Sequence, residues 1–356
     1  METEIIEEGD IELEVPEGRI YDQDVFYNPK MTFDRNLSVA ITSLVEPNSL
    51  CDALSATGVR GIRYKEECGV PEVWLNDINP KAVALIEENC ERNEVDCEIY
   101  NEDAAVLLRK KMHDFIDIDP FGSPAWFLDA VSYSIKNDGF IGITATDTSS
   151  FFGTYPRVSR RRYGRKSMNT DYNKELGLRI LVSALIESLG RYKKTFVPKL
   201  CYFREHYARI CGEVKEGATV VQDNFRNFGY ISHCFSCGWR KDELKKKCPE
   251  CGEETEYVEV YLGKLNDKEF CEEVMKEARN RGFYEEARLA EKLTTDMEVP
   301  YHYDLHYLGK KQGLEIPKTE EAVKKLKDNG HSARISPYSP TAIKTDATFS
   351  EINKLL

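Results

Sequence analysis

The stretch SLCDALSATGVRGIRYKEECGVPEVWLND (residues 49–77) decides the fold class. It holds a short apolar run, a loop with two glycines, a helix-like segment and a second apolar run. Short apolar runs bounded by turn residues predict buried strands, and strand–helix–strand alternation predicts a parallel sheet. The fold is therefore predicted to be α/β.

The same alternation continues to about residue 214. Further strands are predicted at 97–100, 115–119 and 140–146, with a late pair near 195–205 and 207–214. The segments between them read as helices at 61–68, 80–93, 103–111 and 124–136. Sheets of this kind carry helices on both faces and bind ligands beyond the carboxyl ends of their strands. Functional residues are therefore expected directly after each strand.

Acidic residues occupy those positions. Asp52 ends the first strand, and the glycine loop behind it lets the backbone approach a ligand. Asp77 ends the second strand, where a carboxylate accepts hydrogen bonds from the ribose of a nucleoside cofactor. Asp103 and Ala104 follow the third strand, the expected place of an adenine contact. Plain turns and a helix N-cap at Asp103 are the structural alternatives.

The fourth strand runs into DIDPFGSP (117–124), a turn made rigid by two prolines. An exocyclic amine on an aromatic base is a poor nucleophile, so methyl transfer to it needs hydrogen-bond acceptors and an aromatic surface. Asp119 and the carbonyl of Pro120 are candidate acceptors, and Phe121 is a candidate stacking residue. An ordinary turn is the alternative, because D-P-x-G is also a turn signal.

Six motifs, in order from near residue 19 to near residue 350, together resemble the tRNA (guanine-26, N2) dimethyltransferases of archaea and eukaryotes. They are VFYNPKM (25–31) with Arg35, LSATGVRGIR (54–63), WLNDINPKA (74–82), DIDPFGSP (117–124), TATDTSSFFG (144–153) and SPYSPTAIKTD (336–346). The resemblance implies a Rossmann-like class I methyltransferase domain that uses S-adenosylmethionine. It further implies transfer of one, then two, methyl groups to the N2 amine of guanine 26.

The resemblance also assigns residues by motif. The implied cofactor contacts are Arg35, Arg60, Asp77, Asp103 and Ala104. Asp119 is the implied catalytic residue, with Pro120, Phe121 and Phe26 shaping the guanine pocket. The basic run from Arg157 to Lys166 and the segment SPTAIKTD (339–346) are then expected to face tRNA. Adenine amino-methyltransferases commonly carry D/N-P-P-Y/F/W at this loop. Here Phe121 replaces the second proline and a glycine follows, which fits the guanine specificity of the family that the chain resembles.

Two C-x-x-C pairs lie ten residues apart in HCFSCGWRKDELKKKCPECG (233–252). This spacing predicts a structural zinc site made of Cys234, Cys237, Cys248 and Cys251, because four thiolates close a tetrahedral coordination sphere. His233 is an alternative ligand. Arg240 and the lysines at 245–247 are possible tRNA contacts of this insert.

The chain is expected to hold three parts. These are a methyltransferase domain with an N-terminal extension (1–227), a zinc-binding insert (228–258) and a C-terminal tRNA-binding domain (259–356). The last is expected to be mainly helical, at 267–280, 283–296 and 318–329, with two short strands after them in a winged-helix-like arrangement. The polar, basic segment 147–173 is expected to form a loop over the ligand face.

Composition limits the remaining classes. The net charge of −13 argues against indiscriminate nucleic-acid coating, although local basic patches still allow specific binding. No run is long enough to span a membrane, and the acidic start lacks a secretory pattern, so a cytoplasmic location is expected and no protein partner is implied. An adenine amino-methyltransferase and a non-enzymatic zinc-ribbon RNA-binding protein remain alternatives. A nicotinamide-dependent enzyme is disfavoured because G-x-G-x-x-G is missing.

Overall fold

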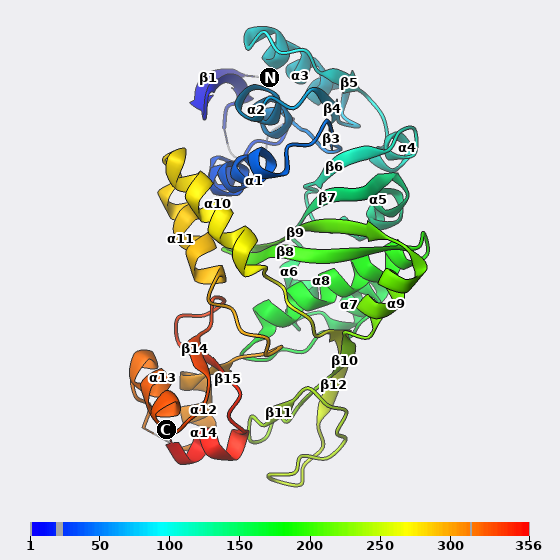
Figure 1. The fold of residues 1–356 in the computed structure, drawn as a ribbon. Helices are drawn as coiled ribbons and strands as arrows, with labels where there is room; N and C mark the ends of the chain where they lie inside the picture. Colours follow the sequence, from blue (N-terminus) through cyan, green and yellow to red (C-terminus); the bar gives the residue numbers. More distant parts are fainter. Residues whose placement is uncertain (1, 19–23, 314, 356) are drawn as a thin grey trace.

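A seven-stranded sheet with the order β5-β4-β3-β6-β7-β9-β8 forms the centre of the computed structural model, which describes residues 2–18, 24–313 and 315–355 (Figure 1). The strands β3 to β7 pair in parallel, and β9 runs antiparallel to both β7 and β8. This arrangement confirms the predicted α/β class. The strands are β3 (Ser49–Asp52), β4 (Glu72–Asn76), β5 (Glu98–Tyr100), β6 (His113–Ile118), β7 (Ile135–Ala145), β8 (Lys194–Arg204) and β9 (Tyr207–Glu216).

Helices cover both faces of this sheet, with α1 and α2 on one side and α4 and α5 on the other (Figure 1). Asn79 caps α3 by accepting a hydrogen bond from the Lys81 backbone, and Pro80 occupies the first helical position as predicted. The helix α8 is apolar on nearly every side because it is enclosed by α5, β8 and β12. The bounds are α1 (Thr32–Val45), α2 (Val59–Cys68), α3 (Pro80–Arg92), α4 (Ala104–Leu108), α5 (Leu128–Ser134), α8 (Asn173–Gly190) and α9 (Ala218–Phe225).

Two segments differ from the prediction. The single helix expected at 124–136 is a 3-10 turn, η3 (Pro124–Trp126), followed by α5, and β7 already begins at Ile135. The expected loop at 147–173 contains two helices, α6 (Thr148–Phe151) and α7 (Pro156–Tyr163). Proline at the first position and Gly164 at φ 74° after the end give α7 its boundaries, whereas its five polar residues in eight hide the helical pattern.

A β-hairpin precedes the sheet, formed by β1 (Thr3–Glu8) and β2 (Ile11–Pro16). It lies against α3, where the Asn89 amide exchanges hydrogen bonds of 2.7 and 3.1 Å with the Glu14 backbone. A 3-10 turn, η2 (Pro29–Met31), leads from this region into α1. The hairpin thus braces the outer helix of the sheet domain.

The chain beyond α9 forms three groups (Figure 1). A small sheet, β11-β10-β12, carries the cysteines, with β10 (Phe228–His233), β11 (Arg240–Lys241) and β12 (Glu256–Tyr261). The helices α10 (Lys268–Asn280) and α11 (Tyr284–Leu293) pack on α1, where Asn36 donates to Glu286 at 3.0 Å and Arg281 to Ser43 at 2.8 Å. The last group comprises β13 (Tyr303–Asp304), α12 (Leu305–Gln312), α13 (Thr319–Asp328), β14 (Ala333–Ile335), β15 (Ala342–Thr345) and α14 (Phe349–Leu355).

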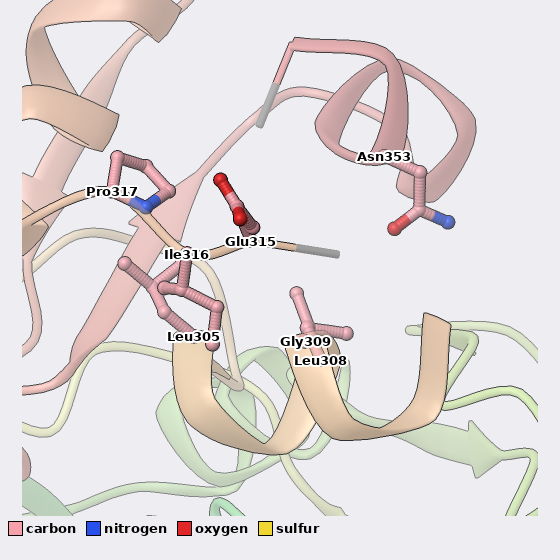
Figure 2. A pocket seen from close by; sticks show the side chains of 7 residues that line it. All are labelled: Leu305, Leu308, Gly309, Glu315, Ile316, Pro317 and Asn353. Atoms are coloured by element: carbon pink, nitrogen blue, oxygen red, sulfur yellow. The ribbon is translucent and has the colours of Figure 1, made fainter. Parts of the chain in front are cut away.

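Of the three helices predicted for the C-terminal part, only the one at 318–329 lies in this last group, as α13, and the two predicted short antiparallel strands, β14 and β15, follow it. The helices predicted at 267–280 and 283–296 are α10 and α11, which pack on α1. Figure 2 shows a small pocket within this last group. It is lined by Leu305 and Leu308 of α12, by Pro317 before α13 and by Asn353 of α14. The pocket has room for about one water molecule and lies away from the carboxyl edge of the large sheet. Among the described residues, no helix combines the length and apolar character needed to cross a bilayer.

Candidate functional site

Four of the predicted acids lie along one edge of the sheet. Asp52 ends β3, Asp77 follows β4, Asp103 follows β5 and Asp119 follows β6. These strands are neighbours and run in parallel, so their carboxyl ends meet. The strand order changes direction between β3 and β6, which is where sheets of this type bind ligands.

Asp77 organises the glycine loop after β3. Its carboxylate accepts hydrogen bonds from the Ala56 backbone at 3.0 Å and from the Asn79 backbone at 2.9 Å. Ala56 and Gly58 both have left-handed backbone conformations, with φ of 52° and 80°, which turns the chain sharply before α2. Asp77 therefore stabilises the turn, as the structural alternative expected, and it also lies at the position predicted for a ribose contact.

Asp52 is buried, and its Oδ2 atom has no hydrogen-bond partner in the part of the chain that the structure describes. It lies opposite Asp117 in the pairing of β3 with β6. Burial, together with the charge of Asp117, raises the pKa of Asp52 to about 7. An unpartnered carboxylate oxygen in such a place is costly for the protein alone and suits a ligand that brings a donor or a positive charge.

Asp103 and Ala104 begin α4. The Asp103 carboxylate accepts hydrogen bonds from the Ala105 and Val106 backbones at 2.9 and 3.3 Å, which makes it the N-cap of this helix. Its side chain is exposed and Ala104 is buried. The N-cap role is present, and it leaves one oxygen of Asp103 open to a ligand at the sheet edge.

Asp119 is held by Arg60 from α2. The Arg60 Nη2 atom donates to Asp119 Oδ2 at 2.5 Å and to Asp34 Oδ2 at 2.6 Å, while Nη1 donates to Ser38 at 2.9 Å. Burial alone would lower the pKa of Arg60, but the carboxylates of Asp117, Asp119 and Asp34 raise it well above its usual value. Arg60 therefore stays charged and fixes one oxygen of Asp119.

A second buried pair lies under the first. Arg209 of β9 binds Asp117 with both guanidinium branches, at 2.6 and 2.9 Å, and the Tyr64 hydroxyl donates to the same carboxylate at 2.7 Å. Asp34, Asp117 and Arg209 were not among the residues predicted from the sequence. A signal existed for Asp117, because residues two apart on a strand share a face and Asp119 had been singled out.

The two aromatic residues predicted to shape the guanine pocket, Phe26 and Phe121, form an exposed pair. The rings of Phe26 and Phe121 have centroids 5.6 Å apart at 61°, and the two residues are 38 % and 75 % exposed. The loop between β6 and η3 is fixed by hydrogen bonds between Gly122 and Thr146, at 2.8, 2.9 and 3.4 Å. Pro120 is buried beneath the turn. An aromatic surface of this kind next to a carboxylate suits a planar base with an amine.

Arg35 lies with the N-terminal hairpin. Its guanidinium donates to both Glu8 oxygens, at 2.6 and 2.5 Å, and to the Asn28 carbonyl at 3.3 Å. Burial would raise the pKa of Glu8, but Arg35 and Arg63 lower it to about 2. The structure thus gives Arg35 a protein partner, and its predicted contact with the cofactor stays a prediction.

Residues 6–356 match the protein family described as "N2,N2-dimethylguanosine tRNA methyltransferase". The chain belongs to this family. A tRNA (guanine(26)-N(2))-dimethyltransferase of Methanopyrus kandleri is 36 % identical, over 100 % of this chain and 97 % of the relative. One of Archaeoglobus fulgidus is 35 % identical, over 97 % and 98 %. Trm1 of Pyrococcus horikoshii, solved in complex with S-adenosyl-L-methionine, superposes with a TM-score of 0.90 at 30 % identity, covering 99 % of both chains. The resemblance and the fold class are thereby confirmed.

The basic run that the family resemblance assigned to tRNA is smaller than its sequence indicates. Arg162 pairs with Asp147 at 2.7 Å, and Arg165 is buried against Glu187 at 2.7 Å. The exposed remainder on and after α7 consists of Arg157, Arg160, Arg161 and Lys166. Lys166 also pairs with Glu256 at 2.9 Å, so acids partner three of the six cations in this run, and its predicted contact with tRNA stays a prediction.

The centre of the motif SPTAIKTD, residues 342–345, is buried and contains its only cation, so the predicted exposure of that cation to tRNA is wrong. Lys344 is 1 % exposed and donates to Glu175 of α8 at 2.8 Å and to Asp296 at 2.7 Å. Arg179 binds the same Glu175 oxygen at 2.8 Å. The motif therefore docks β15 onto the sheet domain.

The four predicted cysteines converge. Their Sγ atoms all lie within 4.8 Å of one another, with Cys234–Cys251 at 3.5 Å and Cys237–Cys248 at 3.6 Å. Thiolates around a tetrahedral zinc lie about 3.8 Å apart, since each Zn–S bond is about 2.3 Å, so the set fits this metal. His233 is buried against Phe235 and is not part of the cluster found among the described residues.

Arg240 corrects another expectation, since it is 1 % exposed and does not face solvent. It pairs with Asp171 at 2.8 Å, donates to the His302 carbonyl at 2.6 Å and lies over the rings of Tyr172 and Tyr303 at 4.8 and 4.5 Å. These partners belong to the sheet domain and to the C-terminal group. Arg240 therefore joins the cysteine insert to both.

Proposed function

We propose that the chain transfers methyl groups from S-adenosylmethionine to the exocyclic N2 amine of guanine 26 in tRNA, first one and then a second. The observation that carries this proposal is the position of Asp119 beside the exposed Phe26–Phe121 pair at the carboxyl edge of the sheet. Family membership supports the same reaction, since the relatives carry the name tRNA (guanine(26)-N(2))-dimethyltransferase.

Asp119 acts on the amine. Its hydrogen bond with Arg60 uses Oδ2, and its side chain is 22 % exposed, so Oδ1 is available to an N–H of the guanine amine. The Pro120 carbonyl is the second acceptor, and stacking on Phe121 and Phe26 holds the base in place. As the N–C bond forms and the S–C bond breaks, positive charge moves to the nitrogen, which Asp119 stabilises until the proton leaves.

S-adenosylmethionine supplies an electrophilic methyl group on a positively charged sulfur. Asp77 would hold the ribose, and Asp103 with Ala104 would hold the adenine. Arg35, Arg60 and Asp52 complete the proposed contacts. The unpartnered Oδ2 of Asp52 and the sharp turn at Ala56 and Gly58 support a ligand at this edge.

We also propose a zinc ion on the four cysteines, with a structural role, because four thiolates leave no open position. The tRNA would lie across the exposed arginines of α7. The Tyr163 hydroxyl at the end of this helix donates to Asp147 and accepts from the Ser123 hydroxyl, both at 2.7 Å, which ties α7 to the turn at residues 117–124.

The test is to incubate the purified protein with unmodified tRNA transcripts and labelled S-adenosylmethionine, and to identify the modified nucleosides by mass spectrometry. Dimethylguanosine that disappears when guanine 26 is replaced supports the proposal. Methyladenosine would keep the cofactor but contradict the substrate. Cofactor binding without product would point to another substrate, and no cofactor binding to the RNA-binding alternative.

Asp119→Ala tests the mechanism. We expect loss of methylation, with cofactor affinity within about tenfold of the parent, because Asp119 acts on the amine. Asp129→Ala is the matched control, since Asp129 is an aspartate of α5 paired with Arg109, away from the sheet edge. Near-normal turnover of Asp119→Ala would remove Asp119 from the reaction.

A further inference from the structure

A row of buried polar groups runs from the core of the sheet domain to Asp119. The Tyr202 hydroxyl of β8 donates to Asp34 Oδ1, and Asp34 Oδ2 accepts from Arg60 Nη2 at 2.6 Å. The same Nη2 atom donates to Asp119 Oδ2 at 2.5 Å. Both hydrogens of one nitrogen are thus used by two carboxylates, one fully buried and one at the site.

Asp34 itself has no access to a ligand. Its side chain has no exposed surface, lies in the first turn of α1 and is surrounded by Arg60, Tyr202 and Arg209. Arg60 Nη1 is held by Ser38, which also receives a hydrogen bond from Arg209. The guanidinium of Arg60 is therefore fixed from the protein side before any substrate arrives.

Burying such charges is costly. An ion pair in the interior rarely stabilises a fold more than well-packed apolar residues of the same size would. What buried, fully hydrogen-bonded pairs provide is a single geometry, because one partner cannot move without leaving the other unpaired. The group at the open end of this row is Asp119.

We propose that Asp34 and Arg60 are positioning residues that fix the Asp119 carboxylate for catalysis, holding Oδ2 so that Oδ1 faces the guanine amine. This inference rests on the proposed function of Asp119. It gives Arg60 a role beyond the cofactor contact expected from its motif, and it brings in Asp34, which touches neither substrate nor cofactor.

Charge supports the assignment. Asp34, Asp117 and Asp119 contribute −3, and Arg60 and Arg209 contribute +2, so the set carries −1. The reaction moves positive charge from sulfur to nitrogen beside this set, and one excess negative charge favours it throughout. Replacing Asp34 with a neutral residue removes that excess and frees Arg60 from its buried anchor.

The test uses the full-length protein and separates turnover from binding. Asp34→Asn should lower kcat at least tenfold at saturating cofactor and tRNA, with the Kd of S-adenosylmethionine within threefold by calorimetry. Arg60→Lys keeps the charge but cannot bridge two carboxylates with one fork, so its kcat should also fall about tenfold. Asp171→Asn is the control, because Asp171 forms a buried pair with Arg240 outside the site.

Several results would overturn the proposal. Cofactor Kd weakened tenfold or more with kcat preserved would assign the row to cofactor binding. If Asp171→Asn lowers kcat as much as Asp34→Asn does, the effect of Asp34→Asn reflects a general loss of stability and not the positioning of Asp119. If Asp34→Asn does not fold, the Arg60→Lys variant tests the proposal alone. A kcat of Arg60→Lys within twofold of the parent contradicts the positioning role.

A double variant separates this inference from the proposed function. If Asp34 acts through Asp119, adding Asp34→Asn to Asp119→Ala should cause no further loss of the residual rate. A further tenfold loss would show that Asp34 acts independently and would overturn the positioning role. Full activity of Asp119→Ala alone would instead refute the proposed mechanism.

Discussion

Asp52 is expected to reduce the stability of the cofactor-free protein as the pH rises, and Asp52→Asn tests this. The side chain is 1 % exposed, and burial together with the charge of Asp117 raises its pKa from 3.8 to about 7. Between these pH values the folded chain keeps a proton on Asp52, whereas the unfolded chain has released it. The free energy of unfolding therefore falls as the pH rises through this window.

The size of the effect follows from the two pKa values. One pKa unit corresponds to about 1.4 kcal/mol, so the cost is about 2 kcal/mol at pH 5 and about 4 kcal/mol at pH 7 and above. Asparagine has the size of the protonated carboxyl and takes up no proton. Because Oδ2 has no hydrogen-bond partner among the described residues, the amide disrupts no bond there. The advantage of Asp52→Asn over the parent should thus be about 2 to 3 kcal/mol larger at pH 8 than at pH 5.

Urea unfolding of the cofactor-free protein, followed by circular dichroism at pH 5 and pH 8, measures this quantity. Taking the difference between variant and parent at each pH cancels the titration of every other group. An equal difference at both pH values would refute the argument, because it would show that burial beside Asp117 does not shift the Asp52 equilibrium.

Three further predictions concern binding and the metal. Asp77→Ala should weaken cofactor binding in calorimetry, because it removes both the proposed ribose contact and the acceptor for the Ala56 backbone; unchanged affinity would rule out the role. Replacing Arg157, Arg160 and Arg161 with glutamine should weaken tRNA binding and reduce its salt slope by about 2 to 3, with Arg226, exposed on the far end of α9, as the control position. The loss of affinity should be independent of tRNA sequence. An unchanged salt slope would show that α7 is a solvated helix with no contact to tRNA. Cys234→Ser should lower the zinc content measured by mass spectrometry and the unfolding temperature together, whereas Cys97→Ser should leave the metal content unchanged; full zinc occupancy without Cys234 would contradict the four-thiolate site.

The sheet and its edge could be predicted from sequence because both depend on local patterns. Short apolar runs specify β3, β4 and β6, and parallel pairing then brings Asp52, Asp77 and Asp119 to one edge whatever the details of packing. The cysteine pairs are equally local, since each pair lies within one tight turn.

The partners of the arginines and of Lys344 could not be predicted. The sequence around an arginine or lysine does not indicate whether its side chain is exposed or buried. Burial depends on acidic residues that are distant in sequence and that the fold brings close. Asp171 lies 69 residues before Arg240, and Glu175 lies 169 residues before Lys344. For this reason the basic run and the SPTAIKTD motif were assigned more exposed charge than the structure leaves.

The junction at Arg240 has a consequence for synthesis. The side chain donates to the Gly238 carbonyl inside the first cysteine turn and to Asp171 and His302 outside it. Residues 228–258 leave the ribosome after the sheet domain and before the C-terminal group, and domains generally fold in that order. We therefore expect capture of the proposed zinc ion to precede docking of the C-terminal group. Until the cysteine turn closes, Arg240 has no fixed position, and the C-terminal group emerges without the surface on which it docks.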